Sequence, residues 1–344
     1  MRPDSEAELA QMIRGATVPL RITGGGTRLH PDDNGLRLDM RGITGITLYE
    51  PEALTLVARA GTPLAEIEAA LAAEKQMLGF EPDPRPGSTI GGVAASNASG
   101  ARRISAGACR DAMLGVRFVT GEGEIVKNGG RVMKNVTGYD LVKLMAGSRG
   151  QLGAITEIAL KTMPMPPLRV TLRLSGTGIE GDLAAMVAAM GGPNDVTGAG
   201  RLPDGKVILR LEGLPGSVEL RAQALRRVLQ PFGQIEIVEG DDDFRRLREF
   251  QMASTSSLWR IVLRSSQALA LLSQLPGRYA LDWGGALIWA EAPPDWTPLL
   301  PAGARAARLR GKAAQLPVAD PVTARLQQGI RAKFDPRGIL GREQ

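Results

Sequence analysis

The first half of the chain consists of short apolar runs separated by turns. Runs of about four to eight apolar or β-branched residues between Gly or Pro predict strands, and apolar residues at helical spacing predict helices. The clearest helix start is Thr62-Pro63, because a hydroxyl cap followed by proline favours the first turn. The predicted elements are strands at 18–22, 43–48, 54–60, 114–120, 124–126 and 152–161, with helices from residue 62 and at 139–145.

A proline-rich segment, Met163-Pro164-Met165-Pro166-Pro167, interrupts this pattern and predicts a domain boundary. Beyond it, strands and helices alternate, and some strands follow one another directly. This order predicts an antiparallel sheet with helices on one face, like repeated ferredoxin-like units. A loose connector is expected at 301–316. The predicted elements are strands at 169–174, 206–212, 235–238, 258–264, 278–282 and 286–291, and helices at 180–190, 216–230, 241–251, 267–275 and 320–333.

Composition narrows the class of protein. The 344 residues are enough for two domains, and 43% are apolar. The single cysteine, Cys109, excludes a disulfide framework, an iron–sulfur cluster or a cysteine zinc site built within this chain. No signal-peptide pattern or apolar run of roughly 20 residues is present, so we expect a cytoplasmic protein that meets a membrane only through partners. The net charge of +6 is dispersed among acidic residues, so no nucleic-acid partner is expected.

Three glycine-rich blocks suggest a binding site. They are Thr23-Gly24-Gly25-Gly26-Thr27, the segment from Pro86 to Gly100, and the segment from Thr137 to Thr156. Glycine lets a backbone approach a ligand closely, and successive N–H groups form nests for phosphate. The blocks therefore predict an extended ligand with a pyrophosphate and a flat ring system. Neither the Rossmann Gly-x-Gly-x-x-Gly spacing nor the Gly-Lys-Ser/Thr of a P-loop is present.

The order of these blocks resembles the vanillyl-alcohol-oxidase type (PCMH type) of FAD-binding domain. That pattern is a strand followed by Gly-Gly-Gly-Thr/Ser, then Pro-Gly-x-x-x-Gly-Gly, and finally Gly-Ser-x-Gly-x-Leu-Gly-x-Ile-Thr. Within this class, the strings at 45–52, 58–67, 76–82 and 134–141 resemble the FAD-binding subunit of bacterial glycolate oxidase. The resemblance extends over nearly the whole chain, most densely from about residue 24 to 161.

The resemblance implies an α+β fold. It consists of a two-part PCMH-type FAD-binding domain at 1–165, an antiparallel-sheet cap at 168–310 with helices on one face, and a C-terminal segment at 318–344 whose helix returns to the FAD domain. FAD is expected to bind non-covalently, because the only histidine, His30, lies beyond the glycine loop.

The resemblance also assigns cofactor contacts. The first block would hold the pyrophosphate, the second would line the pyrophosphate and ribityl chain and reach the flavin, and the third would bracket the pyrophosphate and adenine. An alternative for any single glycine is a tight turn without ligand contact. The assigned residues are Thr23, Gly24, Gly25, Gly26, Thr27, Gly87, Ser88, Thr89, Gly91, Gly92, Ser96, Asn97, Gly100, Gly107, Arg110, Asp111, Gly150, Gly153 and Ile155.

Catalytic residues are less well defined. Related flavoproteins that oxidise D-2-hydroxy acids carry histidines in the second domain, whereas this chain has none after His30. Tyr139, Lys134 or a carboxylate could replace that base, and the sequence selects none of them. Arg260 is a candidate clamp for a substrate carboxylate, with an ordinary strand arginine as the alternative.

The resemblance implies a subunit that works beside a larger homologous flavoprotein and an iron–sulfur subunit, oxidising glycolate or a related D-2-hydroxy acid. One alternative is a self-sufficient FAD-dependent D-2-hydroxy-acid dehydrogenase. Another is an assembly subunit with a degenerate FAD site.

Overall fold

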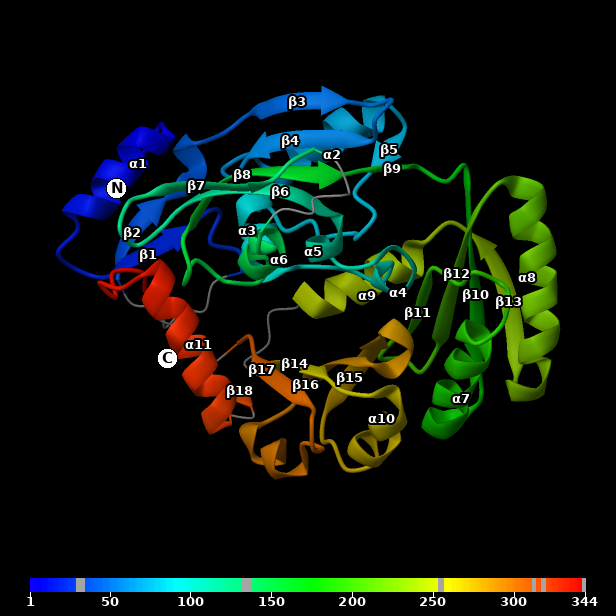
Figure 1. Cartoon of the computed structure of the whole chain (residues 1–344). Helices are drawn as coiled ribbons and strands as arrows, with labels where there is room; N and C mark the ends of the chain where they lie inside the picture. The colour runs from blue at the N-terminus through cyan, green and yellow to red at the C-terminus, as the bar shows by residue number, and fades with distance from the viewer. Residues whose placement is uncertain (29–34, 132–137, 253–256, 311–313, 317–319, 342–344) are drawn as a thin grey trace. The chain divides into compact units, whose positions relative to one another are not determined.

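The structure is a computed structural model that describes residues 1–28, 35–131, 138–252, 257–310, 314–316 and 320–341. The chain forms two compact units (Figure 1). The first unit contains Met1–Gly100, Gly107–Met165 and Ala319–Gln344, and the second contains Ala101–Ala106 and Pro166–Val318. We describe each unit by itself.

The first unit is built on a five-stranded antiparallel sheet with strand order β3-β4-β8-β6-β7. Leu56, Phe118 and Ile158 are fully buried in one core with the apolar face of helix α2. Four consecutive residues of β4, Thr55–Ala58, are buried, so this strand is covered on both faces. The bounds are β3 Ile46–Glu50, β4 Thr55–Arg59, α2 Leu64–Ala73, β6 Met113–Val119, β7 Ile125–Gly129 and β8 Ala154–Lys161.

A smaller layer of the first unit joins the two chain termini. Strand β1 (Leu20–Thr23) pairs in parallel with β2 (Leu36–Asp39), and helix α1 (Glu6–Gly15) packs against them through a separate core. The amide of Leu20 donates to the carbonyl of Ile339, 2.7 Å away. Neither α1 nor β2 was among the predicted elements.

The remaining elements of the first unit are short, except for the C-terminal helix. The predicted hairpin is β6–β7, and the predicted helix at 139–145 is α6. The second glycine block contains a helix, α3, that was not predicted. The bounds are η1 Met40–Gly42, β5 Gln76–Met77, α3 Ile90–Ser96, α5 Cys109–Ala112, α6 Leu141–Met145, β9 Met163–Pro164 and α11 Pro321–Phe334.

The second unit contains a nine-stranded antiparallel sheet, with strand order β13-β10-β12-β11-β15-β16-β14-β17-β18. The predicted α+β class with an antiparallel sheet and a C-terminal helix is confirmed. The strands are β10 Leu168–Ser175, β11 Gly198–Arg201, β12 Val207–Gly213, β13 Gln234–Glu239, β14 Leu258–Val262, β15 Arg278–Asp282, β16 Leu287–Glu291, β17 Arg305–Arg308 and β18 Ala314–Leu316.

Helices pack on both faces of this sheet and not on one face as predicted, and each face has its own core. One face buries Leu172, Leu209 and Ile288 together with residues of α7, α8 and α10. The other buries Ile208 and Leu287 together with residues of α9 and of the segment 101–106. The helices are α4 Arg103–Ala106, α7 Gly178–Met190, α8 Pro215–Leu229, η2 Gln230–Phe232, α9 Asp242–Met252, α10 Ser265–Leu272, η3 Trp283–Gly285 and η4 Pro294–Leu299.

The loose connector predicted at 301–316 is wrong. Strand β17 pairs with β14, and β18 pairs with β17. Backbone hydrogen bonds at a sheet edge are available to any residue, so the weak side-chain pattern of this segment did not reveal them. Strand β11 was also missed. At Gly200 in this strand, an added Cβ would lie 2.8 Å from the carbonyl oxygen of Leu281, so close packing explains the glycine.

The segment 101–106 lies in the sequence between two stretches of the first unit, but it packs with the second unit. Arg102 donates to both carboxylate oxygens of Glu212 on β12, at 2.7 and 3.0 Å, and both side chains are buried. Arg169 lies 3.1 Å from the same carboxylate. The sequence-based division at residue 165 did not separate this segment from its neighbours.

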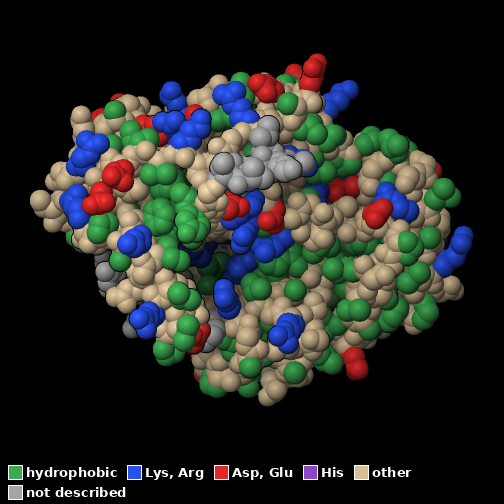
Figure 2. All heavy atoms as spheres, viewed as in Figure 1, with side chains coloured by type: hydrophobic (Ala, Val, Ile, Leu, Met, Phe, Trp, Pro, Cys, Tyr) green, Lys and Arg blue, Asp and Glu red, His purple; other side chains and the backbone are tan. Residues whose placement is uncertain are grey.

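Basic and acidic side chains both occur on the face drawn in Figure 2, with apolar or other residues between most of them. Within the described part of the chain, no helix is long and apolar enough to cross a membrane. The same residues contain no cluster of His, Cys, Asp and Glu that could hold a metal ion.

Candidate cofactor site

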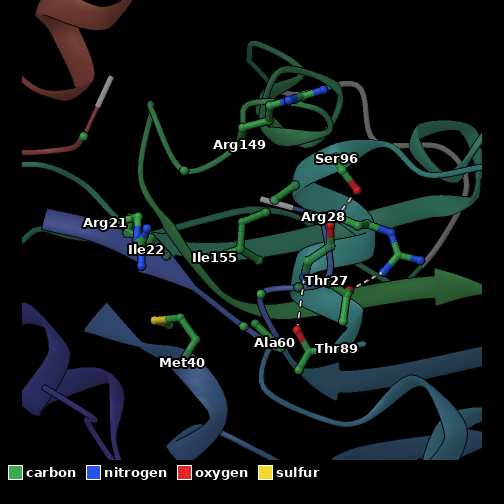
Figure 3. Close-up of a pocket in the computed structure, with 18 of the residues that line it drawn as sticks. Arg21, Ile22, Thr27, Arg28, Met40, Ala60, Thr89, Ser96, Arg149 and Ile155 are labelled. Atoms are coloured by element: carbon green, nitrogen blue, oxygen red, sulfur yellow. Dashed lines mark hydrogen bonds between the residues drawn. The ribbon is translucent and has the colours of Figure 1, made fainter. Parts of the chain in front are cut away.

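A cavity lies in the first unit (Figure 3). Its walls come from β1, the first glycine loop, helix α3 and the loop that precedes β8. Among the predicted cofactor residues, those that line it are Gly24, Gly25, Gly26, Thr27, Thr89, Gly91, Gly92, Ser96, Gly150, Gly153 and Ile155. The fold therefore brings all three glycine blocks to one cavity.

The first two loop glycines are needed because protein packs on them. A Cβ on Gly24 would overlap the hydroxyl oxygen of Thr89, and one on Gly25 would overlap the carbonyl oxygen of Gly87. Gly26 is different. Its φ of +71° favours glycine, and a Cβ there would have no protein atom within 4 Å. The backbone at Gly26 therefore lines the cavity with open space beside it.

The second wall is fixed by short contacts beneath helix α3. The hydroxyl of Thr89 caps the helix by accepting from the amide of Gly92, 3.3 Å away. A Cβ on Gly91 would lie 2.7 Å from the Cβ of Ala60. Glycine at position 91 thus lets the first turn of α3 rest on the end of β4.

The third wall is the loop before β8. Gly150 has a φ of +80°, and Gly153 a φ of +153°. A Cβ on Gly153 would lie 2.8 Å from the ring of Phe118. Ile155, at the start of β8, adds an apolar side chain to the cavity.

An arginine side chain forms hydrogen bonds to both of the first two walls. Arg28 directly follows the glycine loop, and its guanidinium donates to Asp83 Oδ1 at 2.6 Å and to the Asp83 carbonyl at 2.8 Å. It also donates to the hydroxyls of Thr27 and Ser88. Arg85 donates to the Thr27 carbonyl at 2.8 Å and pairs with Asp83.

The cavity carries positive charge. Of the described residues that line it, Arg21, Arg28 and Arg149 are charged, and none is Asp or Glu. Burial lowers the pKa of Arg28, an effect that the Asp83 carboxylate opposes. Because an arginine pKa starts above about 12, the guanidinium stays charged, and the cavity suits an anionic group.

The other predicted cofactor residues do not line the cavity. Thr23 is buried beside β2, where its hydroxyl donates to the Leu38 carbonyl. Gly87 and Ser88 lie behind the first glycine loop and contact Gly25 and Arg28. Those outside the lining are Thr23, Gly87, Ser88, Asn97, Gly100, Gly107, Arg110 and Asp111.

Several of these residues brace a loop instead. Asn97, in the left-handed conformation, accepts from the Arg110 amide at 3.0 Å through its side-chain oxygen. Asp111 accepts from the Ala108 amide at 2.8 Å. Cys109 is fully buried in the same loop, and burial raises the pKa of its thiol to about 12.

The catalytic candidates lie elsewhere. Tyr139 is 89% exposed. Arg260 belongs to β14 of the second unit, where its guanidinium carbon lies 5.3 Å from the ring centre of Trp283 and 5.9 Å from that of Trp289. His30 and Lys134 lie outside the described residues.

Sequence reasoning missed a second group of lining residues. Arg28 had a usable signal, because it follows the glycine loop directly. Ala95 and Arg149 also had one, because they lie inside the second and third glycine blocks. The others come from β1, from Met40 and Ala60 and from the C-terminal segment, and tertiary folding alone brings them to the glycine blocks. The missed residues are Leu20, Arg21, Ile22, Arg28, Met40, Ala60, Ala95, Arg149 and Gly341.

Comparison with known proteins agrees with the geometry. Residues 1–129 match the family described as FAD binding domain. Over 98% of its length, the chain is 36% identical to the glycolate oxidase subunit GlcE of Escherichia coli, and the match covers 95% of that protein. The chain belongs to the GlcE family. Its cofactor is FAD, and the cavity is the candidate site for it.

Two further relatives each match just under half of the chain. The glycolate oxidase subunit GlcD of Bacillus subtilis is 35% identical over 45% of this chain and 34% of its own length. A mitochondrial D-lactate dehydrogenase of Arabidopsis thaliana is 32% identical over 48% of this chain and 30% of its own. The GlcE family is thus related to oxidoreductases.

The fold also matches a solved structure. An alkyldihydroxyacetonephosphate synthase superposes with a TM-score of 0.71 over 99% of this chain and 76% of its own. The two sequences are only 14% identical, so this match supports the fold alone.

The residues in the cavity fit FAD. Gly26 offers backbone with open space beside it, and the charged lining residues are arginines, which suit a pyrophosphate. Ile22, Met40 and Ile155 add apolar surface of the kind that ring systems contact (Figure 3).

Proposed function

We propose that this chain is the FAD-binding subunit of a glycolate dehydrogenase (glycolate oxidase) complex. The complex oxidises glycolate or a related D-2-hydroxy acid to the 2-oxo acid. The observation behind this proposal is the 36% identity with GlcE across almost the full length of both chains. The arginine-lined cavity, formed from all three glycine blocks, supports it.

FAD would be held without a covalent bond. The glycine loop and Thr27 would face the pyrophosphate, with Gly91 and Gly92 on the second wall and Gly150 and Gly153 on the third. When bound, FAD supplies the group that accepts hydride from the substrate. The protein's own part is to orient the cofactor and offset its negative charge through Arg28 and the other cavity arginines.

Arg260 is the proposed contact for the substrate carboxylate. It shares the ring of Trp283 with Arg103, whose guanidinium carbon lies 4.6 Å from the ring centre. Trp283 has a φ of +54°, and its amide donates to Asp282 at 2.8 Å. Such strain is found preferentially at functional sites. Two guanidinium groups beside one ring favour an anionic ligand, and a 2-hydroxy acid is one.

Electrons would leave through partner subunits, a larger homologous flavoprotein and an iron–sulfur protein. GlcE and GlcD are both named as subunits of glycolate oxidase, which supports the first of these partners. We further propose a cytoplasmic location, with membrane contact only through the complex.

The first experiment is a visible absorbance spectrum of the purified chain before and after glycolate is added. We expect a flavin spectrum that glycolate does not bleach until the larger subunit is present. Bleaching of the isolated chain would favour the self-sufficient dehydrogenase. A chain that stays colourless after reconstitution with FAD, yet still binds its partners, would favour the assembly subunit.

A further inference from the structure

Helix α11 presents an apolar stripe to solvent. Val322, Leu326 and Ile330 are 69%, 63% and 39% exposed. Their spacing of four residues places them on one face of the helix. No residue of this 14-residue helix is buried. Helices of this length usually depend on packing of an apolar face for stability, and the described residues of the first unit leave this face uncovered.

The C-terminal end of α11 contacts the first unit. Phe334 packs against the core, with its ring centre 6.0 Å from that of Phe118. The side chain of Arg331 donates to Gln151. At the other end, Asp320 caps the helix by accepting from the amides of Val322 and Thr323. The helix is therefore anchored at its C-terminal end, where Phe334 continues the row of apolar residues, and the three residues before it in that row stay exposed.

A glycine lies within the stripe. Gly329 is seven residues from Val322, so it shares that face. A Cβ at Gly329 would meet no protein atom within 4 Å, so no packing within the described chain requires glycine there. Glycine inside a helix costs about 1 kcal/mol relative to alanine. Close approach by the backbone of another molecule would account for it.

The charged side chains within α11 are all basic. Arg325 and Lys333 lie three residues beyond Val322 and Ile330 and share the same face. No Asp or Glu occurs between residues 321 and 334. A second copy of this chain would bring basic rims together, whereas a partner with acidic groups would complement them.

We propose that Val322, Leu326, Gly329 and Ile330 form a docking surface for the larger flavoprotein subunit, which offers an apolar groove with an acidic rim. This inference rests on the proposed function, in which the chain works within a complex. A membrane is disfavoured as the occupant, because three aliphatic side chains and a glycine give little insertion area and no aromatic anchor. Helix-in-groove docking uses this spacing of anchors.

The test is co-purification and binding with the larger flavoprotein subunit from the same organism, using the full FAD-loaded chain. Leu326→Glu places a charge in the proposed groove, and we expect at least a tenfold loss of affinity. The matched control is Leu220→Glu on α8, where the leucine is 76% exposed, and we expect wild-type affinity. Flavin content reports whether each variant is folded.

A second variant tests the docking surface if Leu326→Glu does not fold. Gly329→Ala strengthens the helix, so we expect an unchanged or higher Tm together with weaker partner binding. Wild-type affinity in both variants would overturn the docking surface. If the wild-type chain does not bind the larger subunit at all, the proposed function itself fails.

Two further measurements separate other occupants of the stripe. The wild-type chain could bind phosphatidylglycerol vesicles. If Leu326→Glu abolished that binding and left partner affinity unchanged, the stripe would be assigned to a membrane. If the wild-type chain sediments as a dimer and Leu326→Glu sediments as a monomer, the stripe would be assigned to contact with a second copy of the chain. We expect neither result.

Discussion

At the scale of single residues, neighbouring glycines of the first loop serve different physical purposes. Gly24 and Gly25 have no space for a side chain because the second glycine block presses on them. Gly26 has space but a backbone conformation that other residues adopt only with strain. The sequence shows three identical letters, and only the structure separates packing from ligand access.

This difference can be tested by adding one methyl group. Gly25→Ala should disrupt the loop, because the methyl group would overlap the Gly87 carbonyl, and we expect lower thermal stability and no bound FAD. Gly26→Ala should cost only about 1–2 kcal/mol of backbone strain while weakening FAD binding. Thermal unfolding of both apo-proteins and FAD titration would measure this. Equal loss of apo stability in the two variants would contradict the assignment.

Arg28 is predicted to be a positioning residue. Arg28→Met removes the charged hydrogen bonds that join the glycine loop to Asp83 and leaves that carboxylate with Arg85 alone. Loss of a charged hydrogen bond costs about 1.5–3 kcal/mol, so we expect FAD affinity to fall at least tenfold. Arg226→Met, on the exposed face of α8, is the control and should bind FAD normally. Normal affinity in Arg28→Met would exclude the positioning role.

At the scale of elements, strand β12 secures a segment that is distant in sequence. Glu212 faces Arg102, Arg169 and Arg210, all within 3.6 Å. Burial raises the pKa of the Glu212 carboxyl, but the hydrogen bond from Arg102 and the charges of Arg210 and Arg102 outweigh it. The pKa therefore lies below its usual value.

Because the folded-state pKa is lowered, the carboxylate stabilises the fold above the unfolded pKa of about 4.3, and this contribution is lost as pH falls further. Glu212→Gln leaves buried cations without their partner, and we expect a loss of about 3–5 kcal/mol in urea unfolding at pH 7. The difference from wild type should shrink below pH 4. The double variant Arg102→Met with Glu212→Leu should recover part of the loss, and no recovery would argue against the pair.

Elements with a strong side-chain period could be predicted from sequence. Helix α2 buries Leu64, Ile67 and Leu71, which follow one another at helical spacing. Elements held mainly by backbone pairing, such as β17 and β11, could not be predicted from the sequence. Helix α3 was hidden because its first turn, Ile90-Gly91-Gly92, has poor intrinsic helix propensity and is stabilised by the Thr89 cap and by β4.

At the scale of the whole molecule, the candidate FAD cavity lies entirely within the first unit. Ligand binding stabilises the folded unit that holds it, by about 2.7 kcal/mol at 100 times Kd. We therefore expect added FAD to slow amide hydrogen exchange in β1, α3 and the loop before β8. Exchange in β10 and β12 of the second unit is the internal reference. If FAD slowed amide exchange equally in both units, the site would not be confined to the first unit.

The sequence by itself indicated FAD, through the resemblance of its motifs to a known family, and just over half of the cavity lining, because such motifs are local properties of consecutive residues. It also indicated two-domain α+β architecture. Tertiary structure decided the rest. The meeting of Arg21, Arg28 and Gly341 at one cavity, the assignment of segment 101–106 to the second unit, and the outward stripe on α11 all depend on contacts between residues far apart in the chain. No local pattern records such contacts, since they arise only when strands pair and cores close.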